Sequence, residues 1–349
     1  MADSTNRPRV FLTRPAGGPA SYRDVIADGF AAVAITSRLR AARTIFIKPN
    51  LVTDNPDYIE RGANTDPQLI EALIDYLQAE TGATLMLGES ETGTRVKGRK
   101  LHRALRGMGL DEVCARKGVR IVNMTEEPKV SVPIPRGRFL HSLELADCLY
   151  NADLIINMPK IKTHKYAAMT CALKNMFGVI PDPLRIVYHK NIHQTVADLG
   201  SVLFHKTVVL CDGMVAMEGG GPLWGIRKDL GLLLFAPDPL SCDRVAHQIM
   251  QFPRRRIRHV VLAEELFGAQ VGPDPIVEGL TVAEVSERFE PAHKNLWIRL
   301  EEELMRHRSV VRVVFNPMVQ KHLIYPVRGV FARLRGGMYT WYVNENDRP

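Results

Sequence analysis

The chain has 349 residues and a mass of 39.1 kDa, which is enough to bury one large hydrophobic core or two smaller ones. Its net charge is +8, and seven of its cations lie within residues 306–335, where no acid occurs. Because a nucleic-acid binder carries its cations on the main folded face, this distribution argues against a nucleic-acid partner. No apolar run reaches the length of a membrane-spanning helix.

The N-terminus lacks the charged and apolar order of a secretory signal, and the five cysteines are scattered without a C-x-x-C pair. These features are typical of a cytoplasmic protein whose thiols are reduced and structural. We expect no intrinsic iron–sulfur cluster.

Strands and helices alternate along the chain. The apolar periodicity predicts strands at 9–13, 44–51, 83–90, 119–123, 154–156, 207–217 and from 231, with an edge strand at 130–135. It predicts helices at 22–35, from Thr65 or Asp66 to 82, and within 97–117, 142–151, 165–178, 189–204 and 238–250. Such alternation indicates a mostly parallel, doubly wound α/β sheet with helices on both faces. We expect this α/β domain over residues 1–295, followed by a basic, aromatic C-terminal extension over 296–349.

Polar residues follow several of these strands. They are Lys48, Asn50, Glu89, Asn157, Asp212 and Glu218. Because the carboxyl ends of parallel strands lie on one edge of a sheet, we expect these side chains to converge. Loops are also polar simply because they meet water.

Residues 153–178 contain the densest polar sequence. Lys160, Lys162 and His164 precede a predicted helix, whose free N–H groups and adjacent cations favour an anionic ligand. A lysine near other cations also loses proton affinity, which suits a base. Lys174 and Asn175 come about one helix length later. They either line another part of the cleft or, for Lys174, stabilise the C-terminus of the helix.

The stretch after the strand at 207–217 combines glycines with carboxylates. Gly219 and Gly221 allow a ligand to approach the backbone, whereas Asp212, Glu218 and His189 could hold a divalent metal. The alternative is a tight turn that the fold requires. Without a following Gly-Lys-Ser/Thr, the stretch is not a Walker phosphate loop.

The order of these motifs resembles the family called domain of unknown function 362. The similarity covers about residues 40–290 and consists of I-K-P-N at 47–50, G-E-S at 88–90, I-I-N-x-P-K-x-K-T-H at 155–164, A-L-K-N-x-F-G at 172–178, Y-H at 188–189, A-D-L at 197–199, D-G-x-x-A-M-E-G-x-G-P at 212–222 and D-P-x-x-x-D at 238–243. The resemblance implies a large α/β domain whose signature residues share a cleft. Many members carry a ferredoxin-like segment, which this chain lacks, and the resemblance implies no particular reaction.

The leading hypothesis is an enzyme of small-molecule metabolism that binds an anionic substrate. Lys48, Lys160 and Lys162 would neutralise the anion, and Asn50 and Asn157 would orient it. Lys174 and Asn175 are further substrate-binding candidates, and His164, Lys162 and Glu89 are the catalytic candidates, with protons moved by His164 or Glu89. The alternative is a redox-associated or maturation accessory protein that binds a metal, a cluster or a partner. The C-terminal extension would be the docking surface of such an accessory protein. Apart from that reading, the extension could contact another copy of the chain or a membrane surface, or simply pack on the body.

Overall fold

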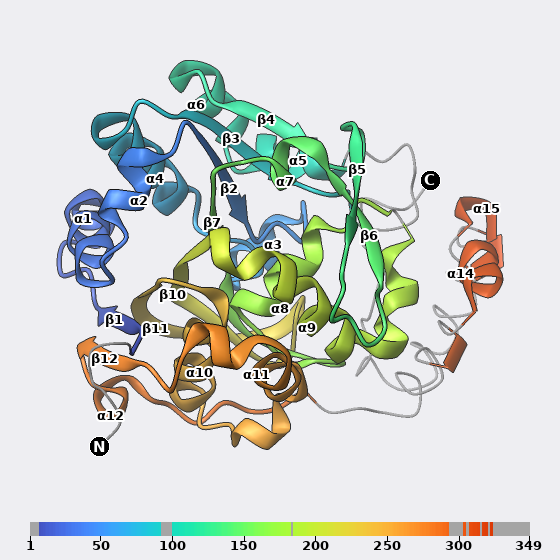
Figure 1. Cartoon of the computed structure of the whole chain (residues 1–349). Helices are drawn as coiled ribbons and strands as arrows, with labels where there is room; N and C mark the ends of the chain where they lie inside the picture. The colour runs from blue at the N-terminus through green and yellow to red at the C-terminus, as the bar shows by residue number, and fades with distance from the viewer. Residues whose placement is uncertain are drawn as a thin grey trace.

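The structure, a computed structural model, describes residues 7–91, 100–182, 184–292, 303–304, 307–314, 316–319 and 322–323. Figure 1 shows a central sheet flanked by helices. The strands are β1 (Arg9–Thr13), β2 (Thr44–Pro49), β3 (Thr84–Glu89), β4 (Arg120–Asn123), β5 (Lys129–Pro133), β6 (Ser142–Ala146), β7 (Leu154–Met158), β8 (Lys160–His164), β9 (Ala168–Thr170), β10 (Thr207–Gly220), β11 (Trp224–Ala236) and β12 (Ile276–Gly279). The α-helices are α1 (Tyr22–Ala32), α2 (Thr36–Ala41), α3 (Pro56–Glu60), α4 (Pro67–Glu80), α5 (Lys100–Gly107), α6 (Leu110–Lys117), α7 (Asp147–Tyr150), α8 (Ala172–Met176), α9 (Ile192–Leu203), α10 (Pro239–Ile249), α11 (Arg258–Val271), α12 (Val282–Val285), α14 (Arg308–Val314) and α15 (Pro317–Val319).

The main sheet has the strand order β12-β1-β11-β10-β7-β2-β3-β4. The run from β10 through β7, β2 and β3 to β4 is parallel, whereas β11 is antiparallel to both β10 and β1. The prediction of a mostly parallel α/β sheet with flanking helices is therefore confirmed. Because β2, β3 and β7 are parallel, their carboxyl ends lie on the same edge of the sheet.

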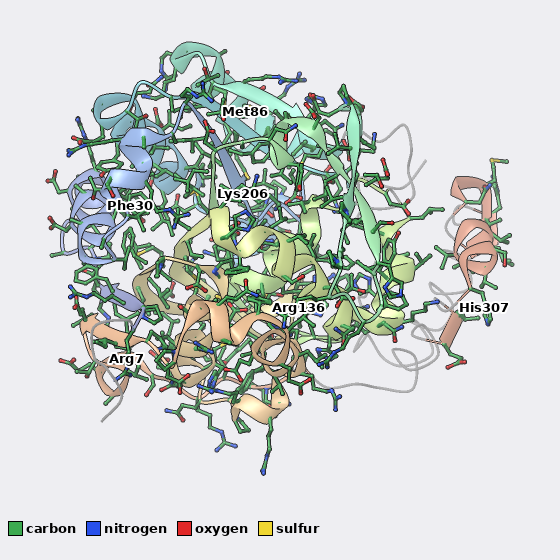
Figure 2. All side chains as sticks on the ribbon, in the orientation of Figure 1. Arg7, Phe30, Met86, Arg136, Lys206 and His307 are labelled. Carbon is green, nitrogen blue, oxygen red and sulfur yellow. The ribbon has the colours of Figure 1, made fainter. Side chains whose placement is uncertain are left out.

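Each face of the sheet is covered by its own hydrophobic core. Residues alternate between the two cores along a strand, so that in β2 Phe46 faces one core and Ile45 and Ile47 face the other. Helices α8–α11 pack over the first face, and α1, α2, α4 and α6 pack over the second. Figure 2 shows side chains filling both layers, with Met86 in the first core and Phe30 in the second.

Two predicted helix starts are confirmed by side-chain caps. The carboxylate of Asp66 accepts a hydrogen bond from the Gln68 N–H at 2.9 Å, and that of Asp238 accepts one from the Ser241 N–H at 2.9 Å. In both helices a proline occupies the first turn, where its missing N–H costs nothing.

The predicted helix over 142–151 is wrong for its first half. Ser142–Ala146 forms β6, which pairs antiparallel with β5, and only Asp147–Tyr150 is helical. The burial of residues 142–145 alternates between exposed and buried, as a strand requires. We attribute the error to helix-forming residues in a segment whose strand partners lie 9 to 17 positions earlier in the chain.

The predicted loop and helix after Pro159 are also largely wrong. Lys160–His164 is β8, which continues along β10 beyond the end of β7 and forms a hairpin with β9. Ala168 has a left-handed φ of 64°, which no helix interior tolerates, and α8 begins only at Ala172. Lys160, Lys162 and His164 therefore lie on a strand and do not precede a helix N-terminus.

Little of the predicted C-terminal extension is described. Helix α14 buries Val311 against the first core, and residues 324–349 of the predicted extension lie outside the described residues. Within the described part, no helix combines the length and hydropathy that a membrane span needs. The domain boundary near 295 and the cytoplasmic location stay predictions.

Candidate functional site

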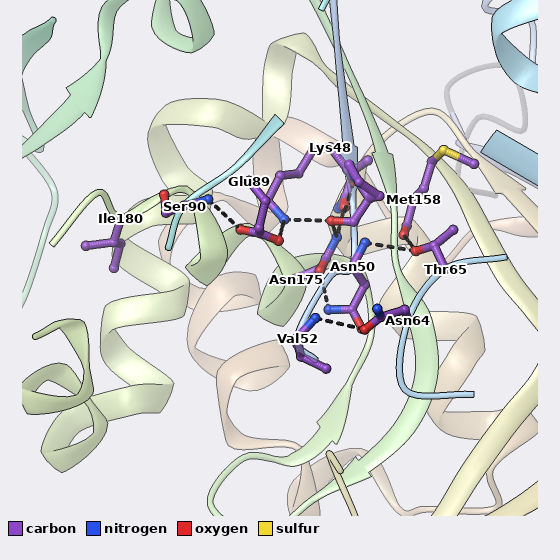
Figure 3. Close-up of polar contacts among 12 residues, drawn as sticks. Lys48, Asn50, Val52, Asn64, Thr65, Glu89, Ser90, Met158, Asn175 and Ile180 are labelled. Carbon is purple, nitrogen blue, oxygen red and sulfur yellow. Dashed lines mark hydrogen bonds and ion pairs between the residues drawn. The ribbon is translucent and has the colours of Figure 1, made fainter. Parts of the chain in front are cut away.

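A buried ion pair joins the carboxyl ends of β2 and β3. Nζ of Lys48 lies 2.5 Å from Oε2 of Glu89, and both side chains are almost fully buried. The other carboxylate oxygen of Glu89 accepts the Ser90 N–H at 3.0 Å (Figure 3). Burial lowers the pKa of Lys48, and the nearby Glu89 opposes that shift. The pair is thus held by opposite charges that the core isolates from water.

The backbone after α8 closes directly over this pair. A methyl group at Gly178 would come within 2.5 Å of Oε1 of Glu89 and 3.0 Å of Nζ of Lys48. Only a residue without a side chain therefore allows the observed approach. The requirement explains a glycine here without invoking a ligand.

Three asparagines form a hydrogen-bonded chain across the same edge. Nδ2 of Asn50 donates to Oδ1 of Asn175 at 2.9 Å, and Nδ2 of Asn175 donates to Oδ1 of Asn157 at 2.7 Å. Nδ2 of Asn157 in turn donates to the carbonyl of Ala172 at 2.8 Å, at the start of α8. The structure thus brings these three predicted site residues together through two amide–amide hydrogen bonds, and Figure 3 shows Asn50 and Asn175.

Lys162 joins the hydrogen-bonded chain of asparagines at Asn50. Its Nζ donates to Oδ1 of Asn50 at 2.6 Å and to the carbonyl of Ala63 at 2.8 Å. Burial lowers the pKa of Lys162 well below its ordinary value, and Lys160, Lys174 and Lys48 lower it further. Among the described residues, no carboxylate lies within ion-pair distance of its ammonium group.

Lys160 differs from Lys162 because it forms an ion pair with a carboxylate. Its Nζ lies 2.9 Å from Oδ1 of Asp212, and both side chains are buried. Asp212 also accepts the N–H groups of Asp66 at 2.8 Å and Met214 at 3.0 Å. Asp212 is therefore fully used in holding β8, β10 and the start of α4 together.

Lys174 extends from α8 toward the same group of cations. It is half-buried, and its Nζ lies 4.4 Å from the centre of the Phe177 ring. Burial, followed by Arg185 and Lys48, lowers the pKa of Lys174 to about 7. Its amine therefore changes protonation near neutral pH, as an acid–base group should.

His164 and His189 lie beside Lys174 with their rings stacked, 6.3 Å between centres. Nδ1 of His164 accepts the N–H groups of Tyr166 and Ala167, both at 3.1 Å. Burial lowers the pKa of His164 well below its ordinary value, so the ring is neutral and carries its proton on Nε2. His164 is then a hydrogen-bond donor through Nε2.

Sequence reasoning missed Arg185. It lies in the 3-10 segment Arg185–Asn191, and its Nη1 donates to the carbonyl of Glu91 at 2.7 Å. Its other bonds go to the carbonyls of Ile180 and Ser90. The guanidinium thus braces the end of β3 behind Glu89. The sequence analysis selected polar residues that follow predicted strands. Arg185 follows no strand, so that criterion could not identify it.

A small pocket reaches Glu89 from the side of α5. Its lining consists of Leu51, Val52, Thr53, Glu89, Ser90, Lys100, Leu101 and Ala104. Oγ of Ser90 is buried there without a hydrogen-bond partner among the described residues. Burial lowers the pKa of Lys100. The pocket therefore presents polar groups next to the carboxylate that Lys48 holds.

The predicted metal ligands Asp212, Glu218 and His189 do not form a metal-binding group in the described part of the chain. Asp212 is bonded to Lys160. Glu218 instead accepts the N–H of Glu290 at 3.0 Å and lies 3.3 Å from Nζ of Lys228. The described side chains that converge closely enough to hold an ion are three cysteines elsewhere. The expectation failed because β10 continues as a strand and carries Glu218 away from Asp212.

Gly219 lies near the end of β10, and Gly221 lies in the turn between β10 and β11. The carbonyl of Gly219 accepts Oγ1 of Thr163 at 3.0 Å, and Gly219 has a left-handed φ of 70°. A methyl group at Gly221 would lie 2.2 Å from the carbonyl oxygen of Thr163. Gly221 therefore lets the hairpin pack on β8, and the backbone conformation of Gly219 favours glycine, which accounts for both without a substrate.

A family match and a related sequence support the motif-based resemblance. A thylakoid-associated protein of Synechocystis sp. is 27% identical over 235 residues, which cover 64% of this chain and 67% of the relative. A crystal structure of a Thermotoga maritima protein aligns over 73% of this chain with a TM-score of 0.40 and 11% identity, and the chain spans 60% of that protein's length. The family described as domain of unknown function (DUF362) matches residues 45–248. That match covers more than half of the 349 residues, and the protein therefore belongs to the DUF362 family.

Proposed function

We propose that the protein is an enzyme that binds a small anionic molecule at the carboxyl edge of the sheet and moves a proton on it. The observation that carries this proposal is that lysines outnumber carboxylates here, with Lys162 buried and Lys174 half-buried. Glu89 pairs with Lys48 and Asp212 pairs with Lys160, whereas Lys162 and Lys174 have no carboxylate at ion-pair distance among the described residues.

Buried ammonium groups without a counter-charge are unfavourable, which is why the pKa values of Lys162 and Lys174 are low. An anion placed beside them would supply the missing charge and raise both pKa values. A carboxylate or a phosphate ester has the required charge and several acceptor oxygens. The missing negative charge beside Lys162 and Lys174 therefore favours an anionic ligand over a neutral or cationic one.

The chemistry follows from the protonation states around Lys174. Its amine, with a pKa of about 7, can accept a proton from a bound molecule and return it. Nε2 of His164 can donate a hydrogen bond to an oxygen on which negative charge develops. In this proposal Lys162 binds the anion, Glu89 fixes Lys48, and the asparagines position Lys162. Proton abstraction leading to isomerisation or elimination is the reaction class.

Anion binding is tested first. A library of small carboxylates and phosphate esters is screened by thermal shift, and each stabilising compound is measured by calorimetry. We expect Lys174→Met to weaken binding by about tenfold or more, because a buried charge-assisted hydrogen bond is worth about 1.5–3 kcal/mol. The charge-matched control is Arg255→Gln, which removes an exposed cation and should leave the affinity unchanged. Equal affinity of Lys174→Met and the wild type would refute this site.

Proton transfer is tested on the compounds that bind. In D₂O, proton abstraction from carbon exchanges that hydrogen for deuterium, and the loss of its proton NMR signal measures the rate. We expect His164→Asn to slow exchange by about 10²-fold or more, because the variant lacks the Nε2–H donor of the imidazole. Asn can still accept the Tyr166 and Ala167 N–H groups, so the local backbone should keep its hydrogen bonds. Binding without any exchange in the wild type would reject the enzymatic role and leave a binding protein.

A further inference from the structure

Three cysteines from distant parts of the chain meet beneath the candidate site. Cys171 precedes α8, Cys211 lies in β10 and Cys242 lies in α10. Sγ of Cys171 is 3.6 Å from Sγ of Cys211 and 3.7 Å from Sγ of Cys242, and the three sulfur atoms lie within 4.8 Å of one another. All three side chains are fully buried. We call these residues the cysteine triad.

A buried carboxylate fixes two of the three cysteines. Asp243, which follows Cys242, accepts the N–H of Ala172 at 2.7 Å and that of Leu173 at 3.1 Å. These bonds tie the residue after Cys242 to the residues after Cys171. The segments that carry the two thiols are therefore joined by hydrogen bonds to the Asp243 carboxylate, and not only by contact of the sulfur atoms.

A second polar group lies behind that carboxylate. His259 is fully buried, and its Nε2 lies 3.8 Å from Oδ2 of Asp243. Neither of its ring nitrogens has a hydrogen-bond partner among the described residues. Purely apolar packing of three thiols would not place an acid and an unbonded imidazole beside them, since buried polar groups normally find partners. The surroundings resemble the outer hydrogen-bonding shell of a metal site.

The geometry points to the cysteine triad as a binding site for one thiophilic d¹⁰ metal ion, Zn²⁺ or Cu⁺. Thiolates are the protein ligands that select these ions. Even with the third pair of sulfur atoms at the 4.8 Å limit, an ion in their plane would lie about 2.4 Å from each sulfur, close to a Zn–S bond of about 2.3 Å.

Two other ligands of the cysteine triad are excluded, an iron–sulfur cluster by the spacing of the sulfur atoms and a hard cation by the ligand type. Sulfur atoms that bind different irons of a cluster are further apart than those that bind one ion, so these three suit a single ion. A hard cation such as Mg²⁺ or Ca²⁺ prefers oxygen ligands and would not select three sulfurs. Binding would displace the thiol protons to solvent, because the thiolate is the ligand form.

The test is metal retention by the full chain. Protein is unfolded and refolded anaerobically with Zn²⁺ in one arm and Cu⁺ in the other, freed of excess metal by gel filtration, and analysed by mass spectrometry. We expect one ion per chain in at least one arm, and at least about a tenfold loss for Cys211→Ser. The matched controls are Cys114→Ser and Cys148→Ser, which alter free cysteines outside the triad and should retain the ion.

The wild type alone also tests the site, so the outcome does not depend on whether Cys211→Ser folds. X-ray absorption of the retained ion should show sulfur as its dominant neighbour. Less than stoichiometric metal in both arms, oxygen or nitrogen neighbours only, or equal retention by Cys211→Ser would each overturn the assignment. Because metal counting does not depend on anion binding, this test fails or succeeds independently of the proposed enzymatic function.

Discussion

Four lysines near the carboxyl edge of the sheet, three of them buried and Lys174 half-buried, fall into two groups that the sequence does not distinguish. Lys48 and Lys160 each contact a buried carboxylate, at 2.5 Å and 2.9 Å. Lys162 and Lys174 contact amide or carbonyl oxygens or an aromatic ring instead. The first two lysines, which we call the paired lysines, join strands of the sheet. The other two, the unpaired lysines, lie where their positive charge is not balanced.

The comparison separates stability from binding. A buried ion pair is lost at high cost when one partner is removed, because the other charge stays behind in a medium of low dielectric constant. A buried cation without a counter-charge has the opposite effect, since removing it relieves a desolvation cost. We therefore expect replacement of the paired lysines to destabilise the fold and replacement of the unpaired lysines to impair ligand binding.

The largest expected effect is that of Lys48→Met. It leaves the carboxylate of Glu89 buried, with the Ser90 N–H as its hydrogen-bond donor and with Arg185 and Lys174 as nearby cations, and breaking a buried pair costs about 3–5 kcal/mol. The free energy of unfolding, measured by urea denaturation, should fall by that amount.

The double variant Lys48→Met/Glu89→Gln is the control for this effect. Gln removes the buried charge and keeps an oxygen that can accept the Ser90 N–H, so the double variant should be more stable than Lys48→Met alone. If the double variant is the less stable of the two, the pair is not the source of the stabilisation.

A smaller effect is expected when the same pair is disturbed without changing any charge. The added methyl of Gly178→Ala would meet Oε1 of Glu89 at 2.5 Å, and overpacking of this kind costs about 1–3 kcal/mol. The control is Gly107→Ala, because a methyl there meets nothing within 4 Å and Ala favours a helix. Equal stability changes for the two variants would show that the backbone does not press on the pair.

The sheet and the meeting of its polar strand ends could be predicted from the sequence. Lys48, Glu89 and Asn157 end buried strands whose apolar runs are unambiguous, and parallel strands share one edge. The caps at Asp66 and Asp238 were predictable for a similar reason, since a short-range signal decides them.

The region after Pro159 could not be predicted because its structure depends on distant partners. The β8 strand forms only because β10 extends past β7 and offers Asp212 and Met217 as neighbours. Helical propensity in residues 165–178 favoured a different local structure, and tertiary pairing overrode it. The same long-range pairing gave Lys160 a carboxylate and left Lys162 without one. The cysteine triad also depends on contacts between residues 40 and 71 positions apart.

The smallest expected effect is a pH dependence that belongs to the unpaired lysines. The pKa of Lys174 is about 7 in the folded protein, against about 10.4 for an unperturbed lysine. Between these values the unfolded chain binds the extra proton, so the free energy of unfolding rises with pH. From pH 7 to pH 8 this one group should contribute an increase of about 1 kcal/mol.

The measurement is the difference between the wild type and Lys174→Met, because other groups titrate in both proteins and cancel. Below pH 7 Lys174 is protonated in both states, so the wild type carries the full cost of burying the charge and the variant should be the more stable. As the pH rises, the free energy of unfolding of the wild type should increase relative to that of the variant. A saturating anionic ligand should reduce this gain by keeping Lys174 protonated in the folded state. A stability difference that is independent of pH would place the amine of Lys174 in water, and the distinction between paired and unpaired lysines would then fail at this residue.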